Sequence, residues 1–509
     1  MTDAHRQLSA LAGTVLQPGF EGTSPPDWVR RWLADGLGGV ALFARNIEHP
    51  AQVAALTAAL RAENPDVIVG IDEEAGDVTR FESRRGSSRP GNLALGAVDD
   101  PQLTEEVARD LGHELAAAGV TLNYAPDADV NSNPDNPVIG VRSFGASPEL
   151  VARHTAAWVR GLQSAGVAAC AKHFPGHGNT AVDSHDEIPR IAASRADLAA
   201  CELLPFRAAI EAGVQSIMTG HLLVPAYDAL WPATLSPAVL TGLLRDELGY
   251  QGLVVTDGIE MRAVAGRYGL AEAAVAALAA GADAVCVGGD HADELTASRL
   301  REAIIQAVIS GALPEERLAQ AAGRVRRLAA WTARSRVPGA NGLRGANGWR
   351  GANGNGSAVG LAAARRAVRL VTHSGPIPPL TAAPHVVEFA PTRNIAIGAE
   401  TPWGLGEPLS GLLPGTTTVR LDAEAAADEA YLDTAALASG AGRPLVVVVR
   451  DAHRHRWMAG AVARLLAARP DAIVVEMGVP ASAGGQMHLA TYGATRVNAQ
   501  AAAELLAGG

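Results

Sequence analysis

The stretch GVAACAKHFPGHGNTAVDSH, residues 166–185, joins a short apolar run to a polar loop punctuated by glycine. The apolar run at 166–171 predicts a buried β-strand, because short continuous apolar runs bounded by turn residues are typical of such strands. A lysine, three histidines and an aspartate crowd into the loop that follows. We therefore predict a buried strand followed by a loop that carries functional residues.

The end of this loop carries Asp183 and His185, two residues apart. In an extended segment, side chains at positions i and i+2 point the same way, so the carboxylate can orient the imidazole. A histidine held by an aspartate can donate and accept protons near neutral pH. This spacing therefore indicates a pair for proton transfer.

Two other interpretations of the loop are a glycine-rich turn with incidental polar residues and a metal site. A metal would be held by His173, His177, Asp183 and His185. The loop lacks a dense ligand motif such as H-E-x-x-H, and Lys172 would place a positive charge beside the cation. We predict no metal and no cofactor.

The first two-thirds of the chain alternate short apolar segments with Ala/Leu-rich segments of helical spacing. Such helical segments are expected at 51–63, 102–118, 148–165, 195–212 and 237–248. Eight alternations in about 300 residues predict an α/β fold, a (β/α)₈ TIM barrel. The alternative is an open doubly wound sheet, but no G-x-G-x-x-G follows any early strand. The expected strands lie at 13–16, 39–43, 67–72, 121–126, 167–173, 216–221, 253–257 and 284–288.

Polar residues fall at the ends of several expected strands. The active sites of TIM barrels lie at the carboxyl ends of their strands. Five reactive side chains are therefore expected on one rim: Asp72, Lys172, His173, His221 and Asp257.

The rest of the chain predicts a linker and a second domain. We expect the barrel at 1–335, a Gly/Asn-rich tether at 336–357 and a smaller three-layer α/β sandwich at 358–509. Its expected strands lie at 386–389, 417–421, 445–449 and 472–477. We expect Asp451 and the histidines after it to lie in a solvated loop.

The composition excludes several classes of protein. The chain has 509 residues, a net charge of −11 and only 4% aromatic residues, so a nucleic-acid partner is not expected. No apolar run approaches the roughly 20 residues of a membrane span, and no signal peptide is evident. The three cysteines do not suggest a disulfide framework. We expect a cytoplasmic protein with a small-molecule substrate and no membrane partner.

Four motifs resemble glycoside hydrolase family 3, in its bacterial two-domain β-N-acetylglucosaminidase branch. They are GGVALFARNI at 38–47, PVIGVRSF at 137–144, the block at 172–185 and VVTDGIEMR at 254–262. By this resemblance Asp257 matches the nucleophile, His185 the acid/base and Asp183 its partner. The resemblance implies that five residues bind the hydroxyls of the non-reducing sugar: Asp72, Arg80, Arg142, Lys172 and His173.

The chain departs from the family pattern in the loop after the third strand. The usual Asp-x-Glu-Gly-Gly-Arg-Val-x-Arg here reads DEEAGDVTR, residues 72–80, so that Ala75 replaces a glycine and Asp77 an arginine. Asn179 stands where an aspartate is common. The charge reversal at Asp77 is expected to change the shape of the loop or what binds beyond the first sugar.

The resemblance implies a retaining exo-β-N-acetylglucosaminidase that acts on cell-wall or chitin-derived oligosaccharides, with a role in peptidoglycan turnover. One alternative is a β-N-acetylglucosaminide phosphorylase, because a histidine repels an incoming phosphate less than a carboxylate does. Another is an amino-sugar-binding protein that has lost catalysis. Since all assigned residues precede the tether, the second domain is expected to be dispensable for catalysis. The oligomeric state stays open.

Overall fold

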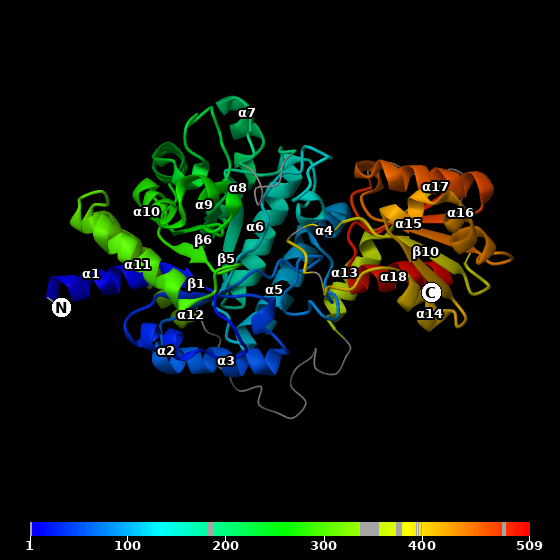
Figure 1. Cartoon of the computed structure of the whole chain (residues 1–509). Coiled ribbons are helices and arrows are strands. Elements are labelled where there is room, and N and C mark those ends of the chain that lie inside the picture. The colour runs from blue at the N-terminus through cyan, green and yellow to red at the C-terminus, as the bar shows by residue number, and fades with distance from the viewer. Residues whose placement is uncertain are drawn as a thin grey trace. The chain divides into compact units, whose positions relative to one another are not determined.

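The computed structural model describes residues 3–181, 188–335, 356–372, 379–392, 394, 396–398, 400–480 and 485–508. The chain forms two compact units (Figure 1). The first unit comprises Met1–Glu74, Thr104–Ile139 and Ala146–Trp349. The second comprises Ala75–Leu103, Gly140–Gly145 and Arg350–Gly509. Two short segments from the amino-terminal half of the chain therefore belong to the second unit.

The first unit contains a curled parallel sheet of the TIM-barrel type, which confirms the expected alternation of strands and helices. Six strands pair in the order β2-β3-β4-β5-β6-β7, and β1 pairs with β8. A parallel bridge between Val255 and Ala284 joins β7 to the chain that leads into β8. The strands are β1 (Leu16–Pro18), β2 (Gly39–Leu42), β3 (Ile68–Ile71), β4 (Leu122–Asn123), β5 (Ala168–Phe174), β6 (Ser216–Thr219), β7 (Leu253–Thr256) and β8 (Val285–Val287).

Helices separate these strands along the chain. They are α1 (Asp3–Thr14), α2 (Asp27–Ala34), α3 (Pro50–Glu63), α5 (Pro101–Ala117), α6 (Pro148–Ser164), α7 (Arg195–Ala200), α8 (Leu203–Glu211), η4 (Ala238–Glu247), α9 (Arg262–Tyr268), α10 (Leu270–Ala280), α11 (Glu294–Ile309) and α12 (Glu315–Ser335), with short turns η1 (Ala44–Asn46) and η3 (Ala233–Leu235). The start of α6 shows the local cause: Ser147 caps it by accepting the Leu150 N–H, and Pro148 occupies its first turn.

Three expected elements differ from the structure. The first strand was expected at 13–16, but Gly13 and Thr14 end α1 and the strand begins at Leu16. The helix expected at 195–212 is two helices, because Pro205 has no N–H to donate to the Cys201 carbonyl of a continuous helix. The segment expected as an α-helix at 237–248 is the π-helix η4, in which the Leu248 N–H donates to the Leu243 carbonyl.

The interior of the first unit is lined by Tyr124, Cys170, Met218 and Cys286 among other buried residues. Tyr124 donates a hydrogen bond of 2.8 Å to the Gln17 side chain. Position 70 must be glycine, because a Cβ there would lie 2.5 Å from the Tyr124 hydroxyl oxygen. The interior is thus filled by side chains, and the strand ends are left to carry polar groups.

The second unit contains a sheet of order β11-β10-β12-β13-β14-β9, parallel except for β9. The strands are β9 (Arg369–Thr372), β10 (His385–Phe389), β11 (Thr417–Leu421), β12 (Leu445–Val449), β13 (Ile473–Glu476) and β14 (Met487–Ala490). One apolar cluster packs this sheet against α15 (Ala423–Ala427), α16 (Glu429–Leu432), η6 (Asp433–Ala438) and α17 (Arg456–Ala468). A second cluster packs it against α14 (Gly406–Leu412) and α18 (Arg496–Ala507).

Two of these strands, β9 and β14, were not expected. Each has only four residues, and each includes polar side chains. The loop after β12, expected to be solvated, is half-buried. The Asp451 N–H in this loop donates to the buried Glu476 side chain at 2.8 Å, which ties the loop to the end of β13.

The segment Ala75–Leu103 contributes α4 (Asn92–Val98) to the second unit, where it packs on α13 (Ala358–Ala367). Ser357 caps α13 by accepting the Gly360 N–H at 3.0 Å. The rest of the expected tether, 336–355, lies outside the described residues. Among the described helices, none alone is long and apolar enough to cross a membrane; α9 and α10 pass that test only together, and their junction is bent by 105°.

Candidate active site

All five residues expected on the rim lie at the end of a strand of the first unit or follow it within two residues, and His221 is the one that lies two residues after its strand, β6. Asp72 comes directly after β3, Asp257 directly after β7, and Lys172 lies near the end of β5 with His173. The carboxyl ends of all parallel strands in a TIM-barrel-like sheet lie at the same end of the barrel. The fold therefore brings these side chains to the same end of the unit.

Lys172 is the centre of a buried ion triad. Its ammonium nitrogen, Nζ, binds the Asp72 carboxylate and lies 2.6 Å from Glu74 Oε1. The side chains of Lys172 and Glu74 are only 2% and 3% exposed, whereas Asp72 is 28% exposed. Glu74 is therefore the buried partner that balances the charge of Lys172. Asp72 is the carboxylate that a ligand can reach.

Asp257 is half-buried in the turn after β7. Its N–H donates to the Thr219 carbonyl at 3.2 Å, and its Oδ1 accepts the Gly258 N–H at 2.7 Å. His221 supports the turn, because its Nε2 lies 3.0 Å from the Gly258 carbonyl oxygen. A carbonyl only accepts hydrogen bonds, so Nε2 carries the proton. His221, expected as a rim residue, thus holds the turn that carries Asp257.

Asp72 and Asp257 act on the same two buried thiols. Burial raises the pKa of Cys170 to about 12, and the charges of Asp72 and Asp257 add to the rise. Burial also raises the pKa of Cys286 well above its ordinary value, and the same two carboxylates contribute. Asp72 directly follows β3 and Asp257 directly follows β7, so both carboxylates belong to the same end of the parallel sheet.

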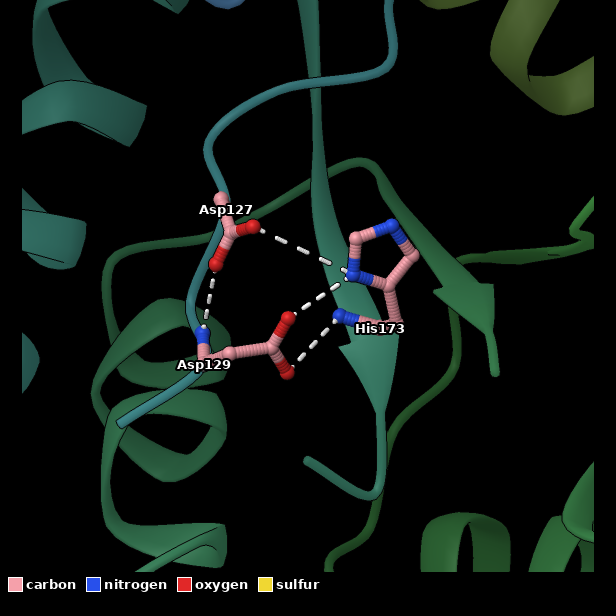
Figure 2. Close-up of side chains that lie close together, drawn as sticks. All are labelled: Asp127, Asp129 and His173. Carbon is pink, nitrogen blue, oxygen red and sulfur yellow. Dashed lines mark hydrogen bonds and ion pairs between the residues drawn. The ribbon is translucent and has the colours of Figure 1, made fainter. Parts of the chain in front are cut away.

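His173 is oriented by acidic side chains that follow β4 (Figure 2). Its Nδ1 lies 2.8 Å from Asp129 Oδ2, and the other Asp129 oxygen accepts the His177 N–H at 2.6 Å. Asp127 accepts the Asp129 N–H at 2.9 Å. Burial alone would raise the pKa of Asp129, but His173 and His177 outweigh it, so this pKa is below its ordinary value.

One carboxylate oxygen of Asp127, one of Asp129 and one ring nitrogen of His173 lie within 4.8 Å of one another, a spacing that a cation could bridge. However, both Asp129 oxygens already accept hydrogen bonds from His173 and His177. We interpret the cluster as a hydrogen-bond network that fixes the orientation of the His173 ring.

Three acidic residues near the strand ends were missed in the sequence: Glu74, Asp129 and Glu260. Glu260 joins the loops after β7 and β8, because its Oε1 accepts the Gly288 N–H at 2.8 Å and that of Gly289. Burial raises the pKa of Glu260, and Asp257 contributes to the rise. Each of the three lies within six residues after a strand, which is the signal that could have indicated them.

Arg80 and Arg142 belong to the second unit. Arg80 Nη1 donates to the Ala396 carbonyl at 3.1 Å. Arg142 lies in η2 (Gly140–Arg142), is 7% exposed, and its carbonyl accepts the Asn92 amide at 2.7 Å. Both arginines are therefore held within that unit.

Asp183 and His185 lie in 182–187, outside the described residues, so their pairing stays a prediction. All three departures from the family pattern lie within the described residues. Asn179 is exposed and hydrogen-bonds Glu202, whose pKa burial raises and Asn179 lowers. Ala75 is buried and adopts a φ of 61°, a left-handed conformation that favours the glycine usual in the family.

A TIM-barrel-like sheet with a lysine, a histidine and carboxylates at its strand ends defines the class as a barrel enzyme. The sequence profile of the glycosyl hydrolase family 3 N-terminal domain matches residues 11–328. The chain therefore belongs to glycosyl hydrolase family 3.

Relatives and solved structures agree with this membership. A beta-hexosaminidase of Thiobacillus denitrificans is 41% identical over 287 residues, which make up 54% of this chain and 79% of the relative. Beta-hexosaminidase A of Pseudoalteromonas piscicida is 38% identical over 51% of this chain, and the match spans about half of that relative, 47%. The chain also resembles the structure of a family 3 β-N-acetylglucosaminidase from Paenibacillus, with a TM-score of 0.85, 35% identity and coverage of 98% of this chain and 96% of the other.

Proposed function

We propose that the chain is a retaining exo-β-N-acetylglucosaminidase that releases terminal N-acetylglucosamine from cell-wall or chitin-derived oligosaccharides. The observation that carries the proposal is that Asp72 and Asp257 directly follow β3 and β7, at the end of the sheet where Lys172 binds Asp72. The relatives named as beta-hexosaminidases support the substrate class. Cell-wall turnover and a cytoplasmic location stay predictions.

In this proposal Asp257 attacks the anomeric carbon and forms a covalent glycosyl-aspartate. Glycoside cleavage passes through an oxocarbenium-like transition state, which a carboxylate beside the sugar stabilises and then traps. His185 protonates the leaving oxygen and later removes a proton from water, while Asp183 orients its imidazole. The pair replaces the second carboxylic acid of most retaining glycosidases.

The remaining site residues hold the sugar. Asp72 can accept hydrogen bonds from sugar hydroxyls, because part of its carboxylate is accessible while Lys172 binds the rest. His173 presents its ring in the orientation set by Asp129. Arg80 and Arg142 complete the set that we propose for the non-reducing sugar.

The proposal also keeps the finer organisation expected from the sequence. We propose a (β/α)₈ barrel at 1–335, a tether at 336–357 and an α/β sandwich at 358–509, with the segments Ala75–Leu103 and Gly140–Gly145 added to the sandwich unit. The sheet that contains β10 to β14 packs helices on both faces, which supports the sandwich.

Hydrolysis rather than phosphorolysis is favoured by the state of Lys172. A phosphate acceptor needs cations that are not already neutralised, and two carboxylates bind this ammonium group. The test is product analysis on an aryl N-acetylglucosaminide and on chitobiose at rising phosphate. We expect free N-acetylglucosamine at every phosphate level. N-acetylglucosamine 1-phosphate as the main product would replace the hydrolase with a phosphorylase, and no turnover of either substrate would refute both.

A further inference from the structure

Asp77, which departs from the arginine usual in the family, lies in a buried ion pair of the second unit. Arg450 Nη2 binds Asp77 Oδ2, and the Ala494 N–H donates to Asp77 Oδ1 at 2.9 Å. The side chains of Asp77 and Arg450 are 4% and 9% exposed. Position 77 is therefore fully engaged, on both carboxylate oxygens, by residues from the carboxyl-terminal part of the chain.

Both partners of Asp77 follow the carboxyl ends of strands in the second sheet. Arg450 directly follows β12, and Ala494 lies four residues after β14, with β13 between these strands. Open α/β sheets usually bind ligands at the carboxyl ends of their parallel strands. Here the carboxylate of Asp77, from the same chain, lies at the carboxyl ends of these strands.

Further contacts tie the segment Ala75–Leu103 to the same unit. Arg80 donates to the Ala396 carbonyl, and Arg496 at the start of α18 reaches the Gly86 carbonyl at 3.4 Å and Glu82 at 3.5 Å. The Asp77–Arg450 pair is the most buried ion pair among these contacts. Asp77 lies three residues before Arg80 in the sequence.

We propose that Asp77 and Arg450 are positioning residues for Arg80: their buried ion pair folds the segment Ala75–Leu103 onto the second sheet and so sets where Arg80 lies. The charge reversal at 77 is then compensated within the chain, since an arginine there would face Arg450. Burial raises the pKa of Asp77, while Arg450 and the Ala494 N–H oppose the rise, as expected for a carboxylate that needs its cation.

This proposal rests on the proposed function for its effect on catalysis, and it reverses the expectation that the second domain is dispensable. A chain cut after the barrel would keep Asp257 and lose the residues that hold Arg80. The role of the pair can be measured on the full-length protein without any substrate, so its failure is distinguishable from failure of the proposed function.

The experiment compares R450M, R450K and the double variant D77N/R450M with a matched control, R464M. Arg464 forms ion pairs with Asp433 and Glu429 in the same unit but contacts nothing in Ala75–Leu103 that the structure describes. The double variant is included because R450M alone leaves a buried carboxylate without its cation and can unfold the unit. Two quantities are measured: amide hydrogen exchange across 75–103, and KM and kcat on an aryl N-acetylglucosaminide.

We expect faster exchange in 75–103 for R450M and D77N/R450M, with KM raised about tenfold or more and kcat changed less. R450K should recover most of both effects, and R464M should change neither. Unchanged exchange in 75–103 in a folded R450M or double variant overturns the proposal, as does an equal change in R464M. If the wild-type protein turns over no N-acetylglucosaminide, the proposed function fails, and the exchange data alone then support or overturn the role of the pair.

Discussion

The two carboxylates around Lys172 should separate stability from activity. In E74Q, Lys172 loses its buried ion-pair partner: the side chains of Lys172 and Glu74 are 2% and 3% exposed. In D72N it loses the partner that is 28% exposed. Both substitutions keep the shape of the side chain and remove one charge, so each serves as the control for the other.

The expected sizes follow from burial. Breaking a buried ion pair by removing one partner costs about 3 kcal/mol or more, so E74Q should lower the free energy of unfolding by about 3 kcal/mol. A pair that is partly exposed is worth about 1 kcal/mol, which is the loss expected for D72N. In activity the order inverts. A charged hydrogen bond to the substrate contributes about 2 kcal/mol, so D72N should lower kcat/KM roughly 30-fold.

The assays are urea unfolding and initial rates on an aryl N-acetylglucosaminide below KM. E74Q should lose the most stability and retain most of kcat/KM, and D72N should do the reverse. If D72N is the less stable protein, or if E74Q loses as much kcat/KM as D72N, Asp72 is not the carboxylate that meets the sugar and the division of roles around Lys172 is wrong.

Three further predictions concern other parts of the chain. A75G should raise the free energy of unfolding, measured by urea unfolding, by about 1 kcal/mol. Ala75 has a φ of 61°, a left-handed conformation that is less strained for glycine, and a decrease would contradict this. H185A should slow glycosides with poor leaving groups far more than activated aryl glycosides, and D183A should show a milder form, whereas equal losses on both substrates would exclude the acid/base role. Burial, with Asp451 adding to it, raises the pKa of Glu476 from 4.5 to about 8, so the folded state holds this proton where the unfolded state has lost it, and stability should fall as pH rises between these values. E476Q should lack this part of the pH dependence; parallel profiles for the two proteins would contradict the shift.

The barrel was predictable because its signals are local. Alternating apolar and helical segments indicated seven of the eight strands of the first unit near their observed positions, and the strand ends located Asp72, Lys172 and Asp257. Two strands of the second sheet, β9 and β14, were missed because each has four residues and includes polar side chains. The break between α7 and α8 had a visible signal in Pro205.

Pairings between distant residues could not be predicted from the sequence. Asp129 lies 44 positions from His173, and Asp77 lies 373 positions from Arg450. Neither distance along the chain nor composition indicates such partners, because only the folded sheets bring them together. The departure at position 77 was visible in the sequence, but its compensation by Arg450 required the structure.

The central claim is that Asp257 is the nucleophile of a retaining glycosidase. The most direct measurement is trapping with a 5-fluoro N-acetylglucosaminide that bears a good leaving group, or with a 2-deoxy-2-fluoro glucoside in which fluorine replaces the acetamido group. Peptide mass spectrometry follows, with D257A as the control. We predict one covalent sugar per chain on the peptide that contains Asp257, and no label and no turnover in a folded D257A. Label on another carboxylate, such as Glu260, or full activity of D257A would contradict the account.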